Sequence, residues 1–510
     1  MKRPPGQQHS PWERDRALLE SCMADVAKRR IPNLPKSLPI RLNPTLHVIP
    51  LAWRNLPELI RGESVVPVRG EAFVIVWRAP GSGELRIATA TDGELLVLKT
   101  VAEDRSPESV AREGGVPLRT VRELMAAAAE RGIVLAPSSR LTRGRSFPRG
   151  IFADDAYFGT RHFTLQWHIT QACDLHCTHC YDRSDRSPMP LERGLRVLDD
   201  LKSFCERHHV TGHVSFTGGN PFLYPHFFEL YQRAADLGFG TIILGNPVSA
   251  ELIERMLAIQ PPSHFQISLE GLQERNDAVR GKGHFKRALA FLKLLREFRI
   301  HSMVMLTLTR DNIDDVLPLA EKLRDHADTF HFNRLAMVGE GVNLRLPDGK
   351  KYWKFLADYL RAARTNPVMG YKDSLLNVLL HQRGEELFGG CAGYGCGAAF
   401  NFVALLPDGE VHACRKFPSC IGNAYEQPLE TIYHSVRARR YRAGCRACAP
   451  CPIRPVCGGC LAVAYGCGLD VFTMKDPLCL MGKNRGKETA KKPRQVPEKR
   501  GTPSVPHGAS

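Results

Sequence analysis

The sequence lacks several features that would fix its class at once. No run approaches the roughly 18 consecutive apolar residues that a membrane-spanning helix needs. The first residues, MKRPPGQQHSPWERDR, have no apolar segment behind their basic side chains, so they do not resemble a secretory signal. No internal repeat of solenoid length is visible. We therefore expect a cytoplasmic protein with no membrane partner.

The chain has enough apolar residues to fold. Hydrophobic residues make up 43% of its 510 positions, which excludes a wholly disordered protein. This length leaves room for about three domains of ordinary size.

The net charge of +17 is concentrated at the two ends of the chain. Residues 1–45 carry nine Lys and Arg against four Asp and Glu, and residues 482–510 carry eight against two. Only +6 of the charge is left for everything between, so a folded basic face for DNA is not implied. We expect a basic N-terminal segment over 1–45 and a disordered basic tail over 482–510.

The sixteen cysteines are unevenly placed. Three lie at Cys173, Cys177 and Cys180, and eleven lie between Cys391 and Cys479. Without a secretory signal the thiols should stay reduced, so a disulfide framework is not expected. Clustered cysteines in a reducing compartment are typical of metal ligands.

Residues 46–140 show the pattern of a winged-helix-like domain. Ser106 is a candidate N-cap for the middle helix, which Gly114 and Gly115 should end. The predicted order is two strands (EAFVIVWRA, ELRIATAT), three helices (GELLVLKTVAE, SPESVAREGG, LRTVRELMAAAAERG) and a last strand (IVLAP).

Residues 155–375 alternate between strands and amphipathic helices. The strand candidates are FTLQWHIT, HVSFTG, TIILG, FQISLEG, SMVMLTLT and TFHFNRL. Six β/α units predict an α/β fold with a parallel sheet, open or curled into a partial barrel, and a site at the carboxyl ends of the strands. Residues 385–481 are rich in Cys and Gly and should need metal to fold.

The first cysteine group has the spacing Cys173-x3-Cys177-x2-Cys180 and directly follows the first strand of the barrel. Three thiolates on one loop can hold three corners of a [4Fe–4S] cluster, which leaves one iron open for a substrate or cofactor. A three-cysteine zinc site is the alternative.

This motif, with His179 at the aromatic position before its last cysteine, resembles that of the radical S-adenosylmethionine (SAM) enzymes. Thr217-Gly-Gly-Asn-Pro221 resembles the family's Gly-Gly-Glu-Pro motif, with Asn in place of Glu, and Ser268-Leu-Glu-Gly271 followed by Arg280-Gly281 resembles a third motif. A helix ion pair would also explain Arg280. The resemblance implies that SAM contacts Gly218, Gly219, Asn220, Ser268 and Arg280.

The resemblance also implies a partial (β/α)6 barrel and a mechanism. A flavodoxin or ferredoxin would supply one electron, and the reduced cluster would split SAM into methionine and a 5′-deoxyadenosyl radical that abstracts a hydrogen atom. No catalytic acid or base is assigned from the sequence.

The C-terminal cysteines resemble the SPASM extension of radical SAM enzymes, which carries two auxiliary [4Fe–4S] clusters. The resemblance assigns Cys391, Cys396, Cys414 and Cys460 to the first cluster, and Cys448, Cys451, Cys457 and Cys479 to the second. Cys467 is the alternative to Cys460, because the Cys457–Cys460 gap is shorter than in many members. A zinc ribbon is the competing interpretation of the paired cysteines.

The resemblance favours a maturase of a ribosomally made peptide, possibly of the thio/seleno-oxazole type. In such enzymes a small winged-helix domain binds the precursor by adding it as a strand, which would be the role of residues 46–140. Those residues could instead form a DNA-binding helix-turn-helix, as in an iron–sulfur redox regulator, but residues 106–135 carry as many Glu as Arg. The second enzyme alternative is heme biosynthesis. Sulfatase maturation is disfavoured, because Arg415 stands where those enzymes carry an acidic residue.

Overall fold

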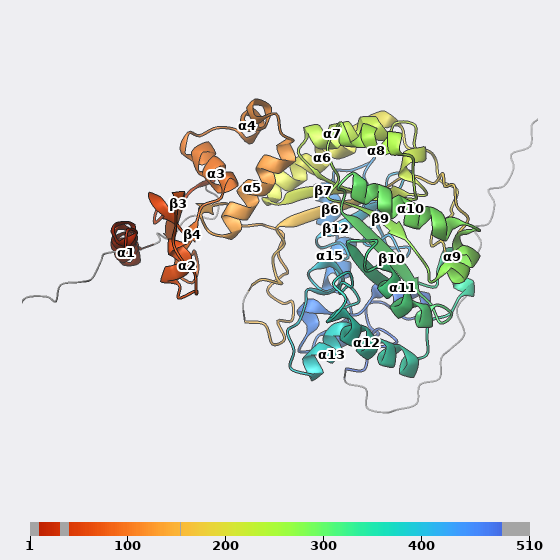
Figure 1. Cartoon of the computed structure of the whole chain (residues 1–510). Helices are drawn as coiled ribbons and strands as arrows, with labels where there is room; N and C mark the ends of the chain where they lie inside the picture. The colour runs from red at the N-terminus through yellow and green to blue at the C-terminus, as the bar shows by residue number, and fades with distance from the viewer. Residues whose placement is uncertain (1–9, 31–39, 154, 482–510) are drawn as a thin grey trace, which may run out of the picture.

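The computed structural model describes residues 10–30, 40–153 and 155–481, so the tail predicted at 482–510 lies outside the described residues. A small N-terminal unit projects from a larger body that contains the barrel and the Cys-rich region (Figure 1). Among the described residues, every helix is too short or too polar to span a bilayer.

The N-terminal unit is a three-stranded antiparallel sheet followed by three helices. As predicted, the Ser106 hydroxyl caps the middle helix by accepting a hydrogen bond from Ser109 N at 3.1 Å, and Gly115 ends it with a φ of 60°. The elements are β1 (Arg41–Leu42), β2 (His47–Arg54), α2 (Leu56–Ile60), β3 (Val68–Arg78), β4 (Leu85–Thr89), α3 (Asp92–Ala102), α4 (Pro107–Gly114), α5 (Leu118–Glu130) and β5 (Val134–Leu135). The sheet order is β2-β3-β4, and β1 pairs with β5.

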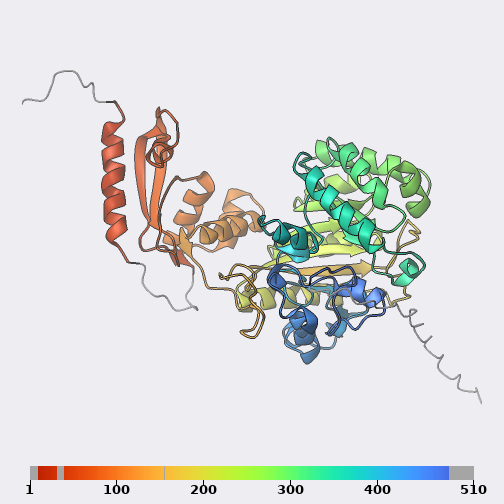
Figure 2. The same cartoon turned by 90° about the horizontal axis from the view of Figure 1, so that it is seen from below.

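The basic N-terminal segment contains a helix that the sequence analysis did not predict. Helix α1 (Glu13–Lys28) lies along the face of the β2–β4 sheet (Figure 2). Leu19 and Val26, seven residues apart on one side of this helix, are fully buried. The Asp15 carboxylate accepts a hydrogen bond from Ala52 N of β2 at 2.6 Å. The high charge of the segment obscured this narrow apolar stripe.

The larger body is built on one nine-stranded sheet with the order β11-β10-β9-β8-β7-β6-β12-β13-β14. Its first six strands along the chain are all parallel, and they confirm the six predicted strands. They are β6 (His162–Thr170), β7 (Thr211–Gly218), β8 (Gly240–Leu244), β9 (His264–Ser268), β10 (Ser302–Leu308) and β11 (Thr329–Arg334). The sheet is thus the parallel sheet of an α/β fold, as predicted.

Helices connect these strands, as the predicted alternation of strands and amphipathic helices requires. The helices of the barrel are α6 (Leu191–His208), α7 (Phe227–Asp236), α8 (Ala250–Leu257), α9 (Gln273–Arg280), α10 (His284–Glu297), α11 (Val316–Leu323) and α12 (Gly349–Ala363). The Cys-rich region adds α13 (Leu376–Gln382), α14 (Leu429–Tyr433), α15 (Val436–Ala443) and α16 (Leu461–Gly466).

The Cys-rich region continues the sheet of the barrel. Strand β12 (Phe402–Leu405) pairs in parallel with β6, so that Ala404 lies opposite Gln166. Strands β13 (Glu410–His412) and β14 (Cys420–Asn423) then add in antiparallel order. This pairing brings the loop that carries Cys414 beside the amino-terminal half of β6, at the level of Thr164.

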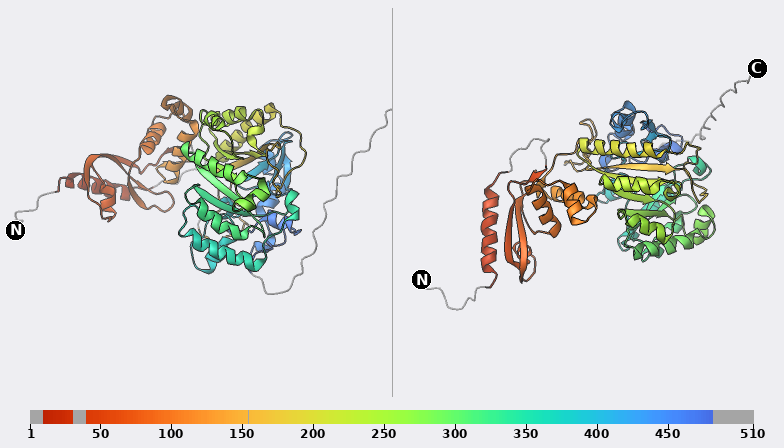
Figure 3. Two further views of the ribbon diagram at one scale, coloured as in Figure 1. Left: turned by 45° about the vertical axis from the view of Figure 1, so that its right-hand side comes forward. Right: turned by 90° about the horizontal axis from the view of Figure 1, so that it is seen from above.

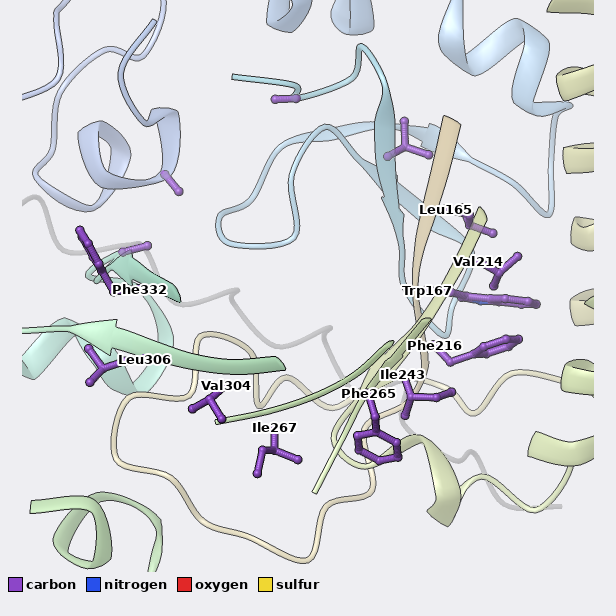
Figure 4. Packing of buried hydrophobic residues seen from close by; sticks show 14 of the residues in the cluster. Leu165, Trp167, Val214, Phe216, Ile243, Phe265, Ile267, Val304, Leu306 and Phe332 are labelled. Atoms are coloured by element: carbon purple, nitrogen blue, oxygen red, sulfur yellow. The ribbon is translucent and has the colours of Figure 1, made fainter. Parts of the chain in front are cut away.

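The strands of the barrel separate apolar from polar side chains. On β6, Leu165 and Trp167 point into the core beneath the helices, where Trp167 stacks on Phe216 with ring centroids 6.0 Å apart (Figure 4). The alternate residues Thr164 and Gln166 line a cavity in the barrel interior. The two-residue period of the strands therefore makes the core apolar and the lumen polar.

The N-terminal unit contacts the barrel through α5 (Figure 3). Arg119 donates a hydrogen bond to Pro261 O at 2.8 Å, and Arg122 donates one to Leu237 O at 2.6 Å. Both carbonyls lie in loops that lead into barrel strands. The unit is thus attached at the amino ends of the strands, away from the loop of Cys173, Cys177 and Cys180.

We expect Leu19→Ala to lower the free energy that holds α1 on the sheet by about 2–5 kcal/mol, because the change leaves a cavity between α1 and the sheet. The matched control is Leu18→Ala, since Leu18 is 50% exposed on the same helix. Hydrogen–deuterium exchange of residues 47–54 should rise in the first variant only. Equal exchange in both variants would show that α1 does not support the sheet.

Candidate active site

The three cysteines of the first group face one cavity of about 330 Å³ at the carboxyl ends of the barrel strands. Cys173, Cys177 and Cys180 lie on the loop after β6, and all three line this first cavity. Burial raises the pKa of the Cys177 and Cys180 thiols above the ordinary value. Three sulfur donors around an open space fit a cluster with one free corner.

Gly218 and Gly219 allow the end of β7 to touch the cysteine loop. A Cβ atom on Gly218 would lie 2.1 Å from Thr170 O, and one on Gly219 would lie 2.1 Å from Ala172 O. Gly218 also has a φ of 133°, which favours glycine. Both glycines also line the first cavity. Their lack of side chains therefore allows close approach of the cysteine loop and leaves room for a ligand in the cavity.

Asn220, predicted to contact SAM, is buried and is hydrogen-bonded to the cysteine loop. Its amide donates to Asp174 Oδ1 at 3.2 Å, and its Oδ1 accepts from Phe222 N at 3.3 Å. Among the described residues, Asn220 is not part of the lining of the first cavity. Asn246, which the sequence analysis missed, does line it, donates to Asp174 at 2.6 Å and lies 3.8 Å from Cys173 Sγ. Its place just after β8 was the available signal.

Ser268 and Arg280, which the resemblance assigned to SAM, both line the first cavity. Arg280 is also ion-paired, but outside its own helix: it donates two hydrogen bonds to Glu270, at 2.6 and 3.0 Å. Its Nη1 lies 3.7 Å from Cys177 Sγ. The ion pair therefore fixes Arg280 beside the cysteine loop.

Glu270 is the centre of this fixed charge arrangement. Its buried carboxylate also lies 3.0 Å from His179 Nε2 and accepts a hydrogen bond from Thr307 N at 2.9 Å. Burial alone would raise the pKa of Glu270, but the charges and hydrogen bonds of His179 and Arg280 lower it to about 2. Glu270 is thus ionised at neutral pH and orients both neighbours.

A second cavity, also of about 330 Å³, adjoins the first inside the barrel. Cys391, Cys396, Cys414 and Cys460, the proposed ligands of the first auxiliary cluster, all line it. Cys467, the alternative to Cys460, does not line it among the described residues. The residues shared with the first cavity include Gln266, Met305, Asn333, Arg334, Arg415 and Lys416.

The proposed ligands of the second auxiliary cluster also lie together. Burial raises the pKa of Cys457, and the nearby Cys479 and Cys451 raise it further. Burial likewise raises the pKa of Cys448 to about 12, with a contribution from Cys445, which hydrogen-bonds to it. Cys445, which the sequence analysis assigned to neither cluster, lies against this set.

A buried ion network that the sequence analysis missed joins the barrel to the Cys-rich region. Arg334, at the end of β11, donates to Asp373 at 2.7 Å and to both oxygens of Asp476 at 2.8 and 2.7 Å. Asp476 also accepts a hydrogen bond from Cys460 N at 2.8 Å. The three charged side chains are at most 3% exposed.

We expect Arg334→Met to destabilise this junction by about 3–5 kcal/mol, because it leaves two buried carboxylates unpaired. Urea unfolding followed by the fluorescence of Trp353 measures this, since the Trp353 indole donates to Leu478 O close to Asp476. Arg361→Met, an exposed arginine on the same helix as Trp353, is the control. An unchanged midpoint for Arg334→Met would contradict the role of the network.

Comparisons with known proteins agree with this geometry. The family model of the radical SAM superfamily matches residues 167–323, and that of the SPASM iron–sulfur cluster-binding domain matches residues 396–460. Mycofactocin maturase MftC of Mycolicibacterium smegmatis is 30% identical over 336 residues, which are 62% of this chain and 82% of the relative. AdoMet-dependent heme synthase of Methanosarcina barkeri is 24% identical over 343 residues, which are 62% and 95% of the two chains.

Among solved structures, Streptococcus suis SuiB bound to its precursor peptide SuiA has the same fold, with a TM-score of 0.51 and 16% identity. The match covers 80% of this chain and 96% of SuiB. Residues 155–510 alone make up a smaller share of the chain than this, so the match must include residues before 155. The likeness of fold therefore reaches into the N-terminal unit. The chain belongs to the radical SAM superfamily, and it is an enzyme that uses a [4Fe–4S] cluster and SAM and carries a SPASM iron–sulfur domain.

Proposed function

We propose that this enzyme modifies a ribosomally made precursor peptide, which the N-terminal unit binds as an added strand. The observation that carries the proposal is the free edge of β4. In the register of β3 with β4, Arg86 and Ala88 turn their backbone groups toward β3, whereas Leu85, Ile87 and Thr89 turn theirs outward. Among the described residues, the contact made to these outward groups is one hydrogen bond from Arg61 to Ile87 O, at 3.0 Å.

The opposite edge of the sheet, on β2, carries one such bond as well, from the amide of Ala52 to Asp15 of α1. On β4 the other outward donors and acceptors are unpaired among the described residues, and backbone hydrogen bonds from an extended peptide to them would supply affinity. Two relatives support this reading by their names, since MftC is a maturase and SuiB was solved with a precursor peptide.

The cavities supply the site of modification. Cys173, Cys177 and Cys180 would hold the cluster, and Gly218, Gly219, Ser268 and Arg280 would contact SAM. When bound, these groups supply a carbon-centred radical that abstracts hydrogen. Glu270 keeps Arg280 in place, and Asn220 and Asn246 hold the cysteine loop. The peptide segment would lie where the two cavities meet, because the second cavity is also lined by the proposed ligands of the first auxiliary cluster.

The auxiliary clusters would be held by the two remaining cysteine sets, with Cys460 rather than Cys467 in the first. An electron donor such as flavodoxin or ferredoxin would reduce the clusters, and the reduced thiols fit a cytoplasmic enzyme. Within the maturases, the Thr217–Pro221 motif with its Asn favours the thio/seleno-oxazole type.

Heme biosynthesis is the second candidate function. It is favoured by the M. barkeri heme synthase, which matches over 95% of its own length. The N-terminal unit with its open strand edge favours the peptide instead, because a porphyrin has no peptide backbone that could pair with such an edge.

We expect the triple change of Cys173, Cys177 and Cys180 to Ala to abolish 5′-deoxyadenosine formation, because no thiolate remains to hold the first cluster. The readout is deoxyadenosine by liquid chromatography under anaerobic reduction. Cys205→Ala, a buried thiol of the core, should retain the activity. SAM cleavage by the triple variant would show that the cluster assignment is wrong.

We expect Thr89→Pro to weaken peptide binding at least tenfold, because proline removes one outward amide and obstructs the edge. Thr89→Ala keeps the amide and is the control. The measurement uses full-length holoenzyme to capture short peptides from anaerobic lysate of its own host. Mass spectrometry then follows the change in mass of the captured peptides when SAM and reductant are added. Equal capture of the same modified peptide by both variants would exclude the β4 edge. Capture of a porphyrin and no peptide would favour heme chemistry.

A further inference from the structure

The charged side chains that line the two adjoining cavities are predominantly basic. The carboxylates in the lining of the two cavities are Asp182 and Asp373. The cations in the lining are Arg183, Arg280, Arg334, Lys372, Arg415 and Lys416. Burying unpaired charge is costly, so each cation needs a partner.

Apart from Arg415, these cations have a partner, lie beside the cysteines or are exposed. Arg183 is exposed, and its Nη1 lies 2.8 Å from His176 Nδ1. Arg280 is paired with Glu270, and Arg334 with two aspartates. Lys416 lies among the thiols of the first auxiliary set, and the negative charge of a thiolate-bound cluster there would balance it. Lys372 donates to Cys391 O at 3.4 Å and lies against the same set.

Arg415 is different, because its guanidinium contacts β7 and the residue after Cys180. Its Nη1 lies 3.5 Å from Thr217 Oγ1, directly before the glycines of β7. Its guanidinium is 5.9 Å from the ring of Tyr181, the residue after Cys180. The Tyr181 hydroxyl is already hydrogen-bonded to His168 Nε2 at 3.0 Å.

The guanidinium of Arg415 therefore lies where the two cavities meet, and it lines both. Among the described residues, no carboxylate lies within ion-pair distance of it. A guanidinium in this setting recognises a carboxylate by two parallel hydrogen bonds, and burial strengthens them.

We propose that Arg415 binds a carboxylate of the peptide segment that is modified, either an Asp or Glu side chain or a C-terminal carboxylate. This rests on the proposed function, because the ligand is the segment placed between the first cluster and the first auxiliary set. The carboxylate of SAM offers the same chemistry. The dissociation constant of SAM, measured beside that of the peptides, distinguishes a SAM carboxylate from a peptide carboxylate.

The test measures binding of short peptides to unreduced holoenzyme with SAM present, by equilibrium dialysis. One pair is acetyl-Gly-Gly-Asp-Gly-Gly-amide against its Asn counterpart, and the other is acetyl-pentaglycine as the free acid against the amide. We expect one acid to bind about tenfold more tightly than its matched amide, since a charge-assisted hydrogen bond contributes roughly that factor. The pair that shows the preference identifies the source of the carboxylate.

Arg415→Gln should remove this preference, and Arg415→Lys should retain part of it, while the dissociation constant of SAM changes less than twofold. Arg310→Gln, an exposed arginine, should keep the full preference. Iron content shows whether each variant keeps the cluster beside Cys414.

Equal binding of acid and amide by the wild type would overturn the proposal, and that comparison needs no variant. A preference that survives in Arg415→Gln, or a parallel loss of SAM affinity, would overturn it too. The peptides carry no leader, so the result does not depend on β4. If no precursor binds but the acid preference is found, the proposed function fails and this site stands.

Discussion

The pairing of β6 on both of its edges is the constraint on which the rest of the structure depends. Strand β7 pairs in parallel with one edge and β12 with the other. The carboxyl ends of β6 and β7 lie side by side and carry the first cysteine group and the two glycines, so the cluster site and the SAM site become neighbours. Strand β13 runs antiparallel to β12 and returns Cys414 to the level of Thr164 on β6, so the first auxiliary set lies deeper in the barrel, below these two sites.

Local patterns in the sequence predicted the parts of this arrangement, and long-range contacts decided how they fit. The six barrel strands were predictable because each has a continuous or alternating apolar run, and the cysteine groups because their spacing is short. Strands β12–β14 have only three or four residues each, too few for a pattern. The pairing of Arg334 with Asp476 spans 142 positions and left no local trace. Asn220 was assigned by its motif to SAM, whereas its neighbours in space are Asp174 and Phe222.

Electrostatics then give the barrel interior its chemical character. The strand period turns polar side chains inward, and two buried acids, Glu270 and Asp476, each neutralise an arginine at the cavity wall. These pairs are costly to bury, and they are kept where they orient groups beside cysteines. Arg415 lines both cavities, and among the described residues no carboxylate lies within ion-pair distance of it, so its charge is available to a substrate.

The central claim is that one cysteine set holds a cluster open to SAM while the SPASM sets hold closed ones. Electron paramagnetic resonance of the reduced holoenzyme, recorded with and without SAM, tests it most directly. We expect SAM to change the signal of one [4Fe–4S] cluster and to leave the other signals unchanged. The signal that responds to SAM should be absent from the triple variant of Cys173, Cys177 and Cys180. Signals that do not respond to SAM, or zinc in place of iron, would contradict it.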